Sequence, residues 1–472
     1  MSDLYANLQR ALNPSTIAVV GDKQSLGFMW LNSLKTFTGH LYSVQVDERE
    51  IAGIEALGVA NYASLAEIPE PLDYVICSVP RQIAPHIVKD CIASGVGGVT
   101  LFTSGFAETG EPEAIALQDQ IESLARGAGL ALIGPNCLGL HIPKLGVRFN
   151  VDQPHGMAGS VGFVSQSGTH GMNFSLTGAA NGVYCSKLVS FGNGVVLEAA
   201  DYLDYFVEDD ETAVIGLYIE GVRDGPRFAR TLRSVAARKP MVIWKGGQTA
   251  AGTRATRSHT ASLAADQAIW ESLVRQAGAV SVDHLDEMID VIKAVLFTKP
   301  AQGQRVGLMA MTGGQSVALT DAFAKAGWEV PRLSDESYAK LGEFFNVIGG
   351  SFQNPLDMAG TIREDPTNLD RLLDIMNRDP NIDAVAMEIS ATFAAHRWER
   401  KPQELEQLLD SLQRFGKRSM KPLVVVLHPA HVESLALGAR MKLQARNIAT
   451  FPSFGRAANA LTKAQIARSA AH

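Results

Sequence analysis

The sequence predicts an α/β protein made of three parallel-sheet domains in series. Short apolar runs rich in β-branched residues alternate with longer stretches of helical spacing, which is typical of parallel sheets with helices on both faces. Two segments rich in turn-forming residues, 146–156 and 298–304, interrupt this alternation and divide the apolar runs into three sets. We therefore expect domains over residues 1–146, 147–299 and 300–472.

Each set of apolar runs predicts the strands of one sheet. The first set comprises Thr16–Val20, Leu41–Val46, Tyr74–Val79, Gly98–Phe102 and Leu130–Ile133, with helical spacing over Gln82–Ala93 and Glu111–Gly127. The second set comprises Val161–Val164, Ser186–Val189, Val214–Tyr218, Met241–Trp244 and Ala279–Val282. The third set comprises Arg305–Ala310, Asp383–Ile389, Leu423–Leu427 and Ile448–Phe451.

Composition excludes several classes of protein. Hydrophobic residues make up 46% and charged residues 19% of the chain, a mixture that builds globular cores. The net charge is −7 with no dominant basic cluster, so we expect no nucleic-acid partner. No apolar run approaches the ~20 residues that span a bilayer, and the start lacks a signal-peptide pattern. The four cysteines form no CxxC pair, which predicts reduced thiols in a cytoplasmic protein without a metal site.

Ligands of open parallel sheets bind at the carboxyl ends of the strands, so the residues after each strand are the candidates for chemistry. In the first domain, four predicted strands end in small, turn-forming stretches that begin near Gly21, Val79, Ser104 and Gly134. Each stretch alone is ordinary turn chemistry. Four of them at one sheet edge favour a shared ligand crevice.

The second domain opens with a strand that runs into Ser165-Gln166-Ser167-Gly168 and then into a helix. Free amides and hydroxyls at a helix N-terminus, which carries partial positive charge, suit a bound phosphate. The competing interpretation is a serine that only caps the helix. The clustering of two serines and a glycine favours phosphate binding.

His259 is the candidate nucleophile. The strand that ends at Trp244 is followed by a run of small polar residues, in which we expect a loop that carries one histidine flanked by hydroxyls and two arginines. Imidazole is nucleophilic near neutral pH, and arginine offsets the charge of a phosphoryl group. His170, beside the predicted phosphate site, is the competitor. Glu220, at the end of another strand, either orients the imidazole or faces solvent.

These segments resemble the ADP-forming (NDP-forming) acyl-CoA synthetases of α-subunit type, which are related to the succinyl-CoA synthetase α subunit. The resemblance spans about residues 14–465 and is most specific at Ser165–Gly168 and at Ser258-His259-Thr260. It implies a Rossmann-like CoA-binding domain followed by two flavodoxin-like domains. It also implies that CoA lies near Gly21, Ser25, Val79, Pro80, Ser104, Gly105, Glu108 and Asn136.

The resemblance further implies that His259 is phosphorylated, that Glu220 orients it and that Ser165, Gln166, Ser167 and Gly168 receive the phosphohistidine. Two departures stand out. Asp22-Lys23-Gln24 replaces the small residues usual after the first glycine, and Ala261 and Ala264 replace glycines beyond His259. We expect the alanines to stiffen the His259 loop.

The predicted function is the α-type subunit of a ligase that converts a small carboxylic acid, CoA and ATP to acyl-CoA, ADP and phosphate. The chain has no GxxxxGK[ST] pattern and no ATP-grasp domain, so we expect a β-type ATP-grasp partner that binds ATP and Mg²⁺, in a hetero-oligomer or homodimer. Two alternatives are a carbamoyl or acyl transferase subunit of the same superfamily and a non-catalytic CoA-binding protein. The sequence leaves the acid, and the choice between ATP and GTP, open.

Overall fold

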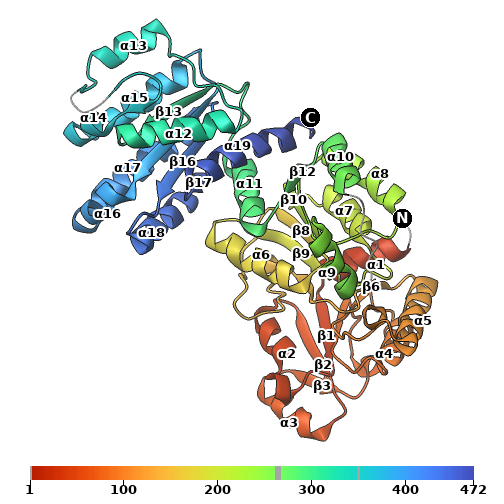
Figure 1. Cartoon of the computed structure of the whole chain (residues 1–472). Coiled ribbons are helices and arrows are strands. Elements are labelled where there is room, and N and C mark those ends of the chain that lie inside the picture. Colours follow the sequence, from red (N-terminus) through yellow and green to blue (C-terminus); the bar gives the residue numbers. More distant parts are fainter. Residues whose placement is uncertain (1–2, 261–266, 348–350, 472) are drawn as a thin grey trace. The chain divides into compact units, whose positions relative to one another are not determined.

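The computed structural model describes residues 3–260, 267–347 and 351–471, with the backbone alone for residues 256–260, Ala359, Arg363 and Ala395. Three parallel or mainly parallel sheets carry the fold (Figure 1), which confirms the predicted α/β class. The chain divides into two compact units. The first holds residues 3–179 and 183–285 and contains two sheets, and the second holds residues 180–182 and 286–469 and contains the third sheet.

The first sheet has six parallel strands in the order β3-β2-β1-β4-β5-β6. This is the Rossmann order, in which the strand sequence reverses between β1 and β4 and leaves a ligand crevice at their carboxyl ends. The strands are β1 (Thr16–Val20), β2 (His40–Val44), β3 (Ala60–Tyr62), β4 (Tyr74–Cys77), β5 (Gly98–Leu101) and β6 (Ala131–Ile133). The helices include α1 (Asp3–Leu12), α2 (Met29–Ser33), α3 (Glu48–Ala56), α4 (Ala84–Ala93) and α5 (Pro112–Ala128), with short 3-10 turns η1 (Gln24–Leu26) and η4 (Ala107–Thr109).

The second sheet has the order β12-β11-β10-β8-β9-β7, and β7 alone runs antiparallel to its neighbour. Although β7 precedes residue 146, it pairs with β9 and so belongs to the second sheet. The strands are β7 (Gly139–His141), β8 (Val161–Ser165), β9 (Cys185–Ser190), β10 (Val214–Ile219), β11 (Met241–Lys245) and β12 (Val280–Val282). The helices are α6 (Gly168–Ala180), α7 (Ala199–Glu208), α8 (Gly225–Ala236), α9 (Ala250–Thr260) and α10 (Gln267–Ala277).

The third sheet, in the second unit, has five parallel strands in the order β14-β13-β15-β16-β17. They are β13 (Val306–Ala310), β14 (Leu356–Asp357), β15 (Ala384–Ser390), β16 (Leu423–His428) and β17 (Thr450–Phe451). Successive residues of β15 enter apolar cores on opposite faces, as expected for a strand buried on both sides. The helices are α11 (Leu285–Phe297), α12 (Gly313–Lys325), α13 (Asp335–Gly342), α14 (Ala359–Glu364), α15 (Asn368–Arg378), α16 (Ala391–Arg400), α17 (Pro402–Arg418), α18 (Glu433–Gln444) and α19 (Phe454–Ser469).

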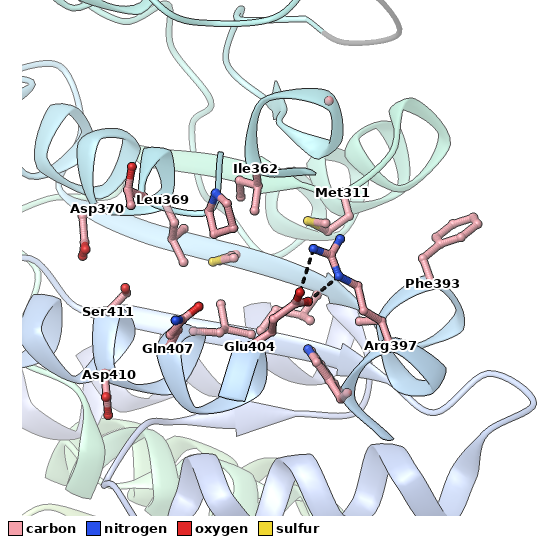
Figure 2. A pocket seen from close by; sticks show the side chains of 18 of the residues that line it. Met311, Ile362, Leu369, Asp370, Phe393, Arg397, Glu404, Gln407, Asp410 and Ser411 are labelled. Carbon is pink, nitrogen blue, oxygen red and sulfur yellow. Dashed lines mark hydrogen bonds and ion pairs between the residues drawn. The ribbon is translucent and has the colours of Figure 1, made fainter. Parts of the chain in front are cut away.

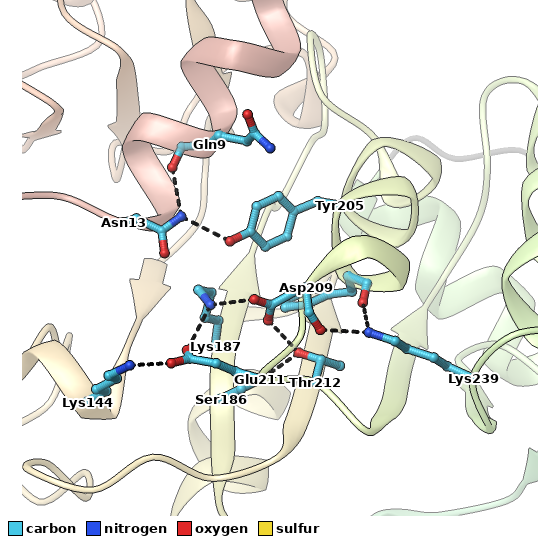
Figure 3. Close-up of polar contacts among 11 residues, drawn as sticks. Gln9, Asn13, Lys144, Ser186, Lys187, Tyr205, Asp209, Glu211, Thr212 and Lys239 are labelled. Atoms are coloured by element: carbon cyan, nitrogen blue, oxygen red, sulfur yellow. Dashed lines mark hydrogen bonds and ion pairs between the residues drawn. The ribbon is translucent and has the colours of Figure 1, made fainter. Parts of the chain in front are cut away.

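A hydrogen bond joins the end of α1, which packs on the first sheet, to α7, which packs on the second (Figure 3). The Asn13 side chain at the end of α1 donates to the hydroxyl of Tyr205 on α7 at 3.1 Å. Nearby, the ammonium of Lys187, whose side chain is 2% exposed, contacts Asp209 at 2.9 Å and Glu211 at 3.2 Å. A buried ammonium needs such partners, because an unpaired charge away from water is costly.

The loop expected around His259 is wrong for most of its length, because residues 250–260 form helix α9. The Thr249 hydroxyl accepts the backbone N–H of Gly252 at 3.0 Å, which caps the first turn. Alanines at 250, 251 and 255 favour helix over coil, a preference that outweighs the small polar residues between them. Across the described ranges, no helix is both long enough and apolar enough to span a bilayer.

Candidate functional site

The loops after β1 and β4 meet at the carboxyl edge of the first sheet. Gly21 has φ +81°, and a β-carbon there would lie 2.6 Å from a methyl of Val79, so only glycine fits this approach. Ser25, Pro80 and Ser104 expose their side chains at the same edge. The structure therefore brings these predicted CoA-binding residues to one sheet edge.

The departure at Asp22 has a structural explanation. The Asp22 side chain is buried and accepts the backbone N–H of Leu31 at 2.9 Å and of Lys23 at 3.1 Å. Burial raises the pKa of its carboxyl group. Asp22 therefore braces the segment that leads into α2, and it does not place a carboxylate on the open face of the loop.

The loop after β5 is held by its own polar groups. The Gly105 N–H donates to Oε1 of Glu108 at 2.6 Å, and the Arg81 guanidinium donates to the Gly105 carbonyl. The Thr103 hydroxyl donates to the Val79 carbonyl and ties this loop to the loop after β4. The predicted residues Gly105 and Glu108 thus form a braced loop at the carboxyl edge of the first sheet.

Asn193, on the loop after β9, joins the two sheets at this point. Its Nδ2 donates to Oε2 of Glu108 at 2.7 Å, and its Oδ1 lies 3.4 Å from Nδ2 of Asn136. Asn136 has a positive φ of 59°. We did not predict Asn193 as a site residue. The available signal was its position between two glycines, four residues beyond the end of a predicted strand.

The predicted phosphate site lies where β8 runs into α6. The Ser165 hydroxyl donates to the Ser167 carbonyl at 2.6 Å, and the Ser167 hydroxyl accepts the His170 N–H at 3.3 Å. Oε1 of Gln166 accepts two backbone N–H groups beyond β10, those of Glu220 at 2.8 Å and Gly221 at 3.1 Å. Gln166 therefore fixes Glu220 relative to this helix start.

Glu220 presents a buried carboxylate oxygen at this site. Its Oε1 accepts the Tyr218 hydroxyl at 3.1 Å, and its Oε2 is buried without a hydrogen-bond partner among the described residues. Gly246, after β11, lies against the same pair, because a β-carbon there would sit 2.6 Å from the Tyr218 oxygen. A buried carboxylate oxygen without a donor is costly, so this atom is suited to receive one from an arriving group.

His170, the competing histidine, is packed among aromatic rings. Its imidazole lies 4.4 Å from the ring of Tyr218 and 4.4 Å from that of Trp244, centroid to centroid. Burial lowers its pKa, while the negative charge of Glu220 acts in the opposite direction. His170 thus forms part of the wall beside Glu220.

His259 lies in the last turn of α9, where the structure describes its backbone but not its side chain, and Ala261 and Ala264 lie outside the described residues. Helix α9 follows β11, which pairs with β10, and Glu220 directly follows β10. Helix α9 also contacts η4, which includes Glu108. The helix that carries His259 is therefore adjacent to a loop that contains predicted CoA-binding residues.

The second unit contains a further cavity of about 820 Å³ (Figure 2), which we did not predict. Apolar side chains line much of it, among them Met311, Ile362 and Leu369. Four of the charged residues that line it form two ion pairs, since Arg397 contacts Glu404 and Arg414 contacts Asp370. Its walls come from β15, from four helices and from the segments at 311–312 and 366–367, so no single stretch of sequence predicts it.

Two family profiles match most of the first unit. The CoA binding domain matches residues 15–143, and the succinyl-CoA ligase like flavodoxin domain matches residues 158–295. These matches agree with the Rossmann order of the first sheet and with the mainly parallel second sheet.

Similar proteins extend the comparison to nearly the whole chain. The alpha subunit of acetate–CoA ligase [ADP-forming] II from Pyrococcus furiosus is 33% identical over 391 residues, which cover 81% of this chain and 82% of that subunit. Acetate–CoA ligase [ADP-forming] I from Archaeoglobus fulgidus is 32% identical over 82% of this chain, but the match covers only 55% of that longer relative. A dinucleotide forming acetyl-coenzyme A synthetase 1 from Ca. Korarchaeum cryptofilum, solved with phosphate and ADP, has a TM-score of 0.83 and 27% identity over 98% of this chain and 97% of that one.

The identity and extent of these matches confirm the family resemblance that the motifs predicted. The chain belongs to the family of ADP-forming acetate–CoA ligases and is of the α-subunit type.

Proposed function

We propose that this chain is the α-type subunit of an ADP-forming acid–CoA ligase in which His259 carries the phosphoryl group. The observation that carries the proposal is the buried Oε2 of Glu220, which has no donor among the described residues. This oxygen belongs to a residue that Gln166 ties to the helix start of α6, at the sheet edge from which α9 leaves. An imidazole N–H is the donor that this arrangement suits.

In the synthetic direction, His259 attacks the γ-phosphorus of ATP, which releases ADP and gives a phosphohistidine. The acid's carboxylate then attacks its phosphorus, forming an acyl phosphate and freeing the imidazole. The CoA thiol attacks the acyl carbon, and phosphate leaves. Glu220 accepts one imidazole N–H so that the other nitrogen carries phosphate, and the backbone amides at Ser167 and Gly168 stabilise its oxygens. The loops around Gly21 and Gly105 hold CoA.

The proposal includes a separate ATP-grasp subunit that binds ATP and Mg²⁺. Two relatives from Pyrococcus furiosus are alpha subunits, and this chain covers 82% and 77% of their lengths. This chain spans about half the length of the undivided Archaeoglobus fulgidus relatives. The relatives are ligases, so they favour this function over a carbamoyl or acyl transferase subunit. The small carboxylic acid remains to be chosen by a substrate screen.

The test uses the reverse half-reaction, which consumes neither ATP nor ADP. The chain is incubated with [³²P]phosphate and a panel of acyl-CoA thioesters, from acetyl-CoA to phenylacetyl-CoA. Phosphate displaces CoA to form an acyl phosphate, which passes its phosphoryl group to His259 and releases the acid. We expect an acid-labile, base-stable phosphoprotein.

The matched control compares two histidines. His259→Asn should abolish labelling, whereas His170→Asn should retain a labelled protein because His170 forms part of the wall. Equal labelling of wild type and His259→Asn would contradict the assignment of the phosphorylated residue. Absence of labelling from every thioester, with CoA bound, would contradict the proposed chemistry.

A further inference from the structure

We propose that Asn193 is a positioning residue that locks the CoA-binding loops to the phosphate-site sheet and so sets where the CoA thiol lies. The inference rests on the proposed function and adds a residue to its machinery. Asn193 belongs to the loop after β9, in the second sheet, while its side-chain partners belong to the first domain.

The Asn193 amide uses both of its ends. Nδ2 donates to Oε2 of Glu108 at 2.7 Å and to Oε1 of Gln118 at 3.0 Å. Oδ1 faces Nδ2 of Asn136 at 3.4 Å. The other oxygen of Glu108 holds the Gly105 N–H, so the Asn193 side chain is coupled directly to the loop after β5. A hydrogen bond to a carboxylate is about twice as strong as one between neutral groups.

The backbone around Asn193 makes the same connection. The N–H of Asn193 donates to the Pro135 carbonyl at 3.0 Å, and the N–H of Val195 donates to the Gly134 carbonyl at 3.2 Å. At Gly192, a β-carbon would lie only 2.2 Å from the Asn136 carbonyl oxygen. The two loops thus approach as closely as a glycine allows.

The other end of this loop reaches the phosphate site. The Phe191 N–H donates to the carbonyl of Ser165 at 2.9 Å, and the Leu138 N–H donates to the hydroxyl of Ser190 at 3.1 Å. Asn193 is therefore two residues beyond a direct backbone contact with Ser165, the last residue of β8 and a predicted phosphate ligand. One side chain links the loop after β5 to that strand.

A positioning role predicts a selective defect. Asn193→Ala removes the charge-assisted bond to Glu108 and frees the loop after β5, while β8, α6 and Glu220 keep their contacts. Losing a hydrogen bond to a charged group weakens an equilibrium by about tenfold. We expect the Kd for CoA, measured by isothermal titration calorimetry, and the KM for acetyl-CoA in [³²P]phosphate labelling each to rise about tenfold.

Labelling with acetyl [³²P]phosphate distinguishes a positioning role from a general loss of structure, because a general loss would slow this reaction too. Acetyl phosphate phosphorylates His259 and releases acetate without using CoA. The rate of this CoA-independent route should stay within about twofold of wild type in Asn193→Ala, whereas the CoA-dependent route falls. Asn13→Ala is the matched control, because it also removes a hydrogen bond between the two sheets, to Tyr205, but far along the chain from the crevice loops. It should leave both routes and the Kd for CoA unchanged.

Exchanging the amide of Asn193 and the carboxylate of Glu108 tests the same contact. Asn193→Asp places a carboxylate against Glu108 and should weaken CoA binding more than the alanine does. Adding Glu108→Gln supplies an amide donor to Asp at position 193 and should recover at least part of the loss. An unchanged Kd for CoA in Asn193→Ala, or an equal fall in both labelling routes, would overturn the inference. If the wild-type protein binds CoA but is phosphorylated by neither route, the proposed chemistry is wrong. In that case the CoA titrations alone still test the role of Asn193.

Discussion

Gly246→Ala is the substitution that tests the geometry around Glu220 most directly. The added β-carbon would lie 2.6 Å from the Tyr218 hydroxyl oxygen and 3.1 Å from Cγ of Glu220. Tyr218 has little room to retreat, because its ring lies 4.4 Å from that of His170 and 4.7 Å from that of Trp244. The clash must therefore displace the Tyr218–Glu220 pair.

The size of the effect follows from three contributions. Overpacking a filled site costs about 1–3 kcal/mol, and losing the bond from Tyr218 to the Glu220 carboxylate costs about 1.5–3 kcal/mol. Alanine returns about 0.4–1 kcal/mol by restricting the unfolded chain. We expect a net loss of about 3 kcal/mol in unfolding free energy. Because displacements near 1 Å cost up to about 10²-fold in rate, phosphohistidine formation should fall at least tenfold.

The assay combines urea denaturation with acetyl [³²P]phosphate labelling at fixed protein concentration. Gly127→Ala is the matched control, since Gly127 lies in α5 and, apart from the neighbouring backbone of that helix, no atom lies within 4 Å of the added β-carbon. That control should be as stable as wild type or more stable by up to about 1 kcal/mol, with normal labelling. If Gly246→Ala matched the control in both measurements, the tight packing of Gly246 against Tyr218 and Glu220 would be refuted.

Two further predictions concern buried titratable groups. Burial lowers the pKa of His141 from 6.5 to about 4, so the unfolded chain binds the extra proton between these values and stability falls as the pH drops from 6.5 to 4. The shift corresponds to about 3 kcal/mol of unfolding free energy. In urea denaturation at several pH values, His141→Asn should remove this dependence of stability on pH. An unchanged dependence would show that His141 is not its source. Burial raises the pKa of Glu388 from 4.5 to about 7, so the folded chain holds the extra proton and stability is lost as the pH rises from 4.5 through 7. The glutamine of Glu388→Gln can still accept the Met311 N–H but cannot ionise. The variant should therefore be more stable than wild type by about 3 kcal/mol at pH 8 and as stable as wild type at pH 4. A variant less stable than wild type at both pH values would contradict this explanation.

The longer elements of the fold could be predicted because they carry their own signal. The run Thr16–Val20 is a strand with the predicted bounds, and Tyr74–Val79 ends only two residues early, at Cys77. Three short strands, β3, β7 and β14, were not predicted, since two or three residues are too few to show a period. The equally short β6, β12 and β17 lie in predicted apolar runs. Helix α9 was missed for another reason, because its alanines are spaced among residues that are equally common in loops.

The candidate site also has a part that the sequence predicted and a part that it did not. The sequence predicted Ser165, Glu220 and Gly105 as candidate site residues, because the carboxyl ends of parallel strands are where such sheets bind ligands. The pairing of Asn193 with Glu108 joins residues 85 positions apart, and local pattern holds no information about that distance.

By itself, then, the sequence determined the α/β class, the family and most strand ends, since these depend on local runs of apolar and turn-forming residues. Only the tertiary structure decided that β7 joins the second sheet, that Asn193 bridges two domains and that one oxygen of Glu220 is buried without a donor among the described residues. The physical reason is that hydrogen bonding and desolvation depend on which segments meet in space, and that choice is made by the packing of the whole first unit.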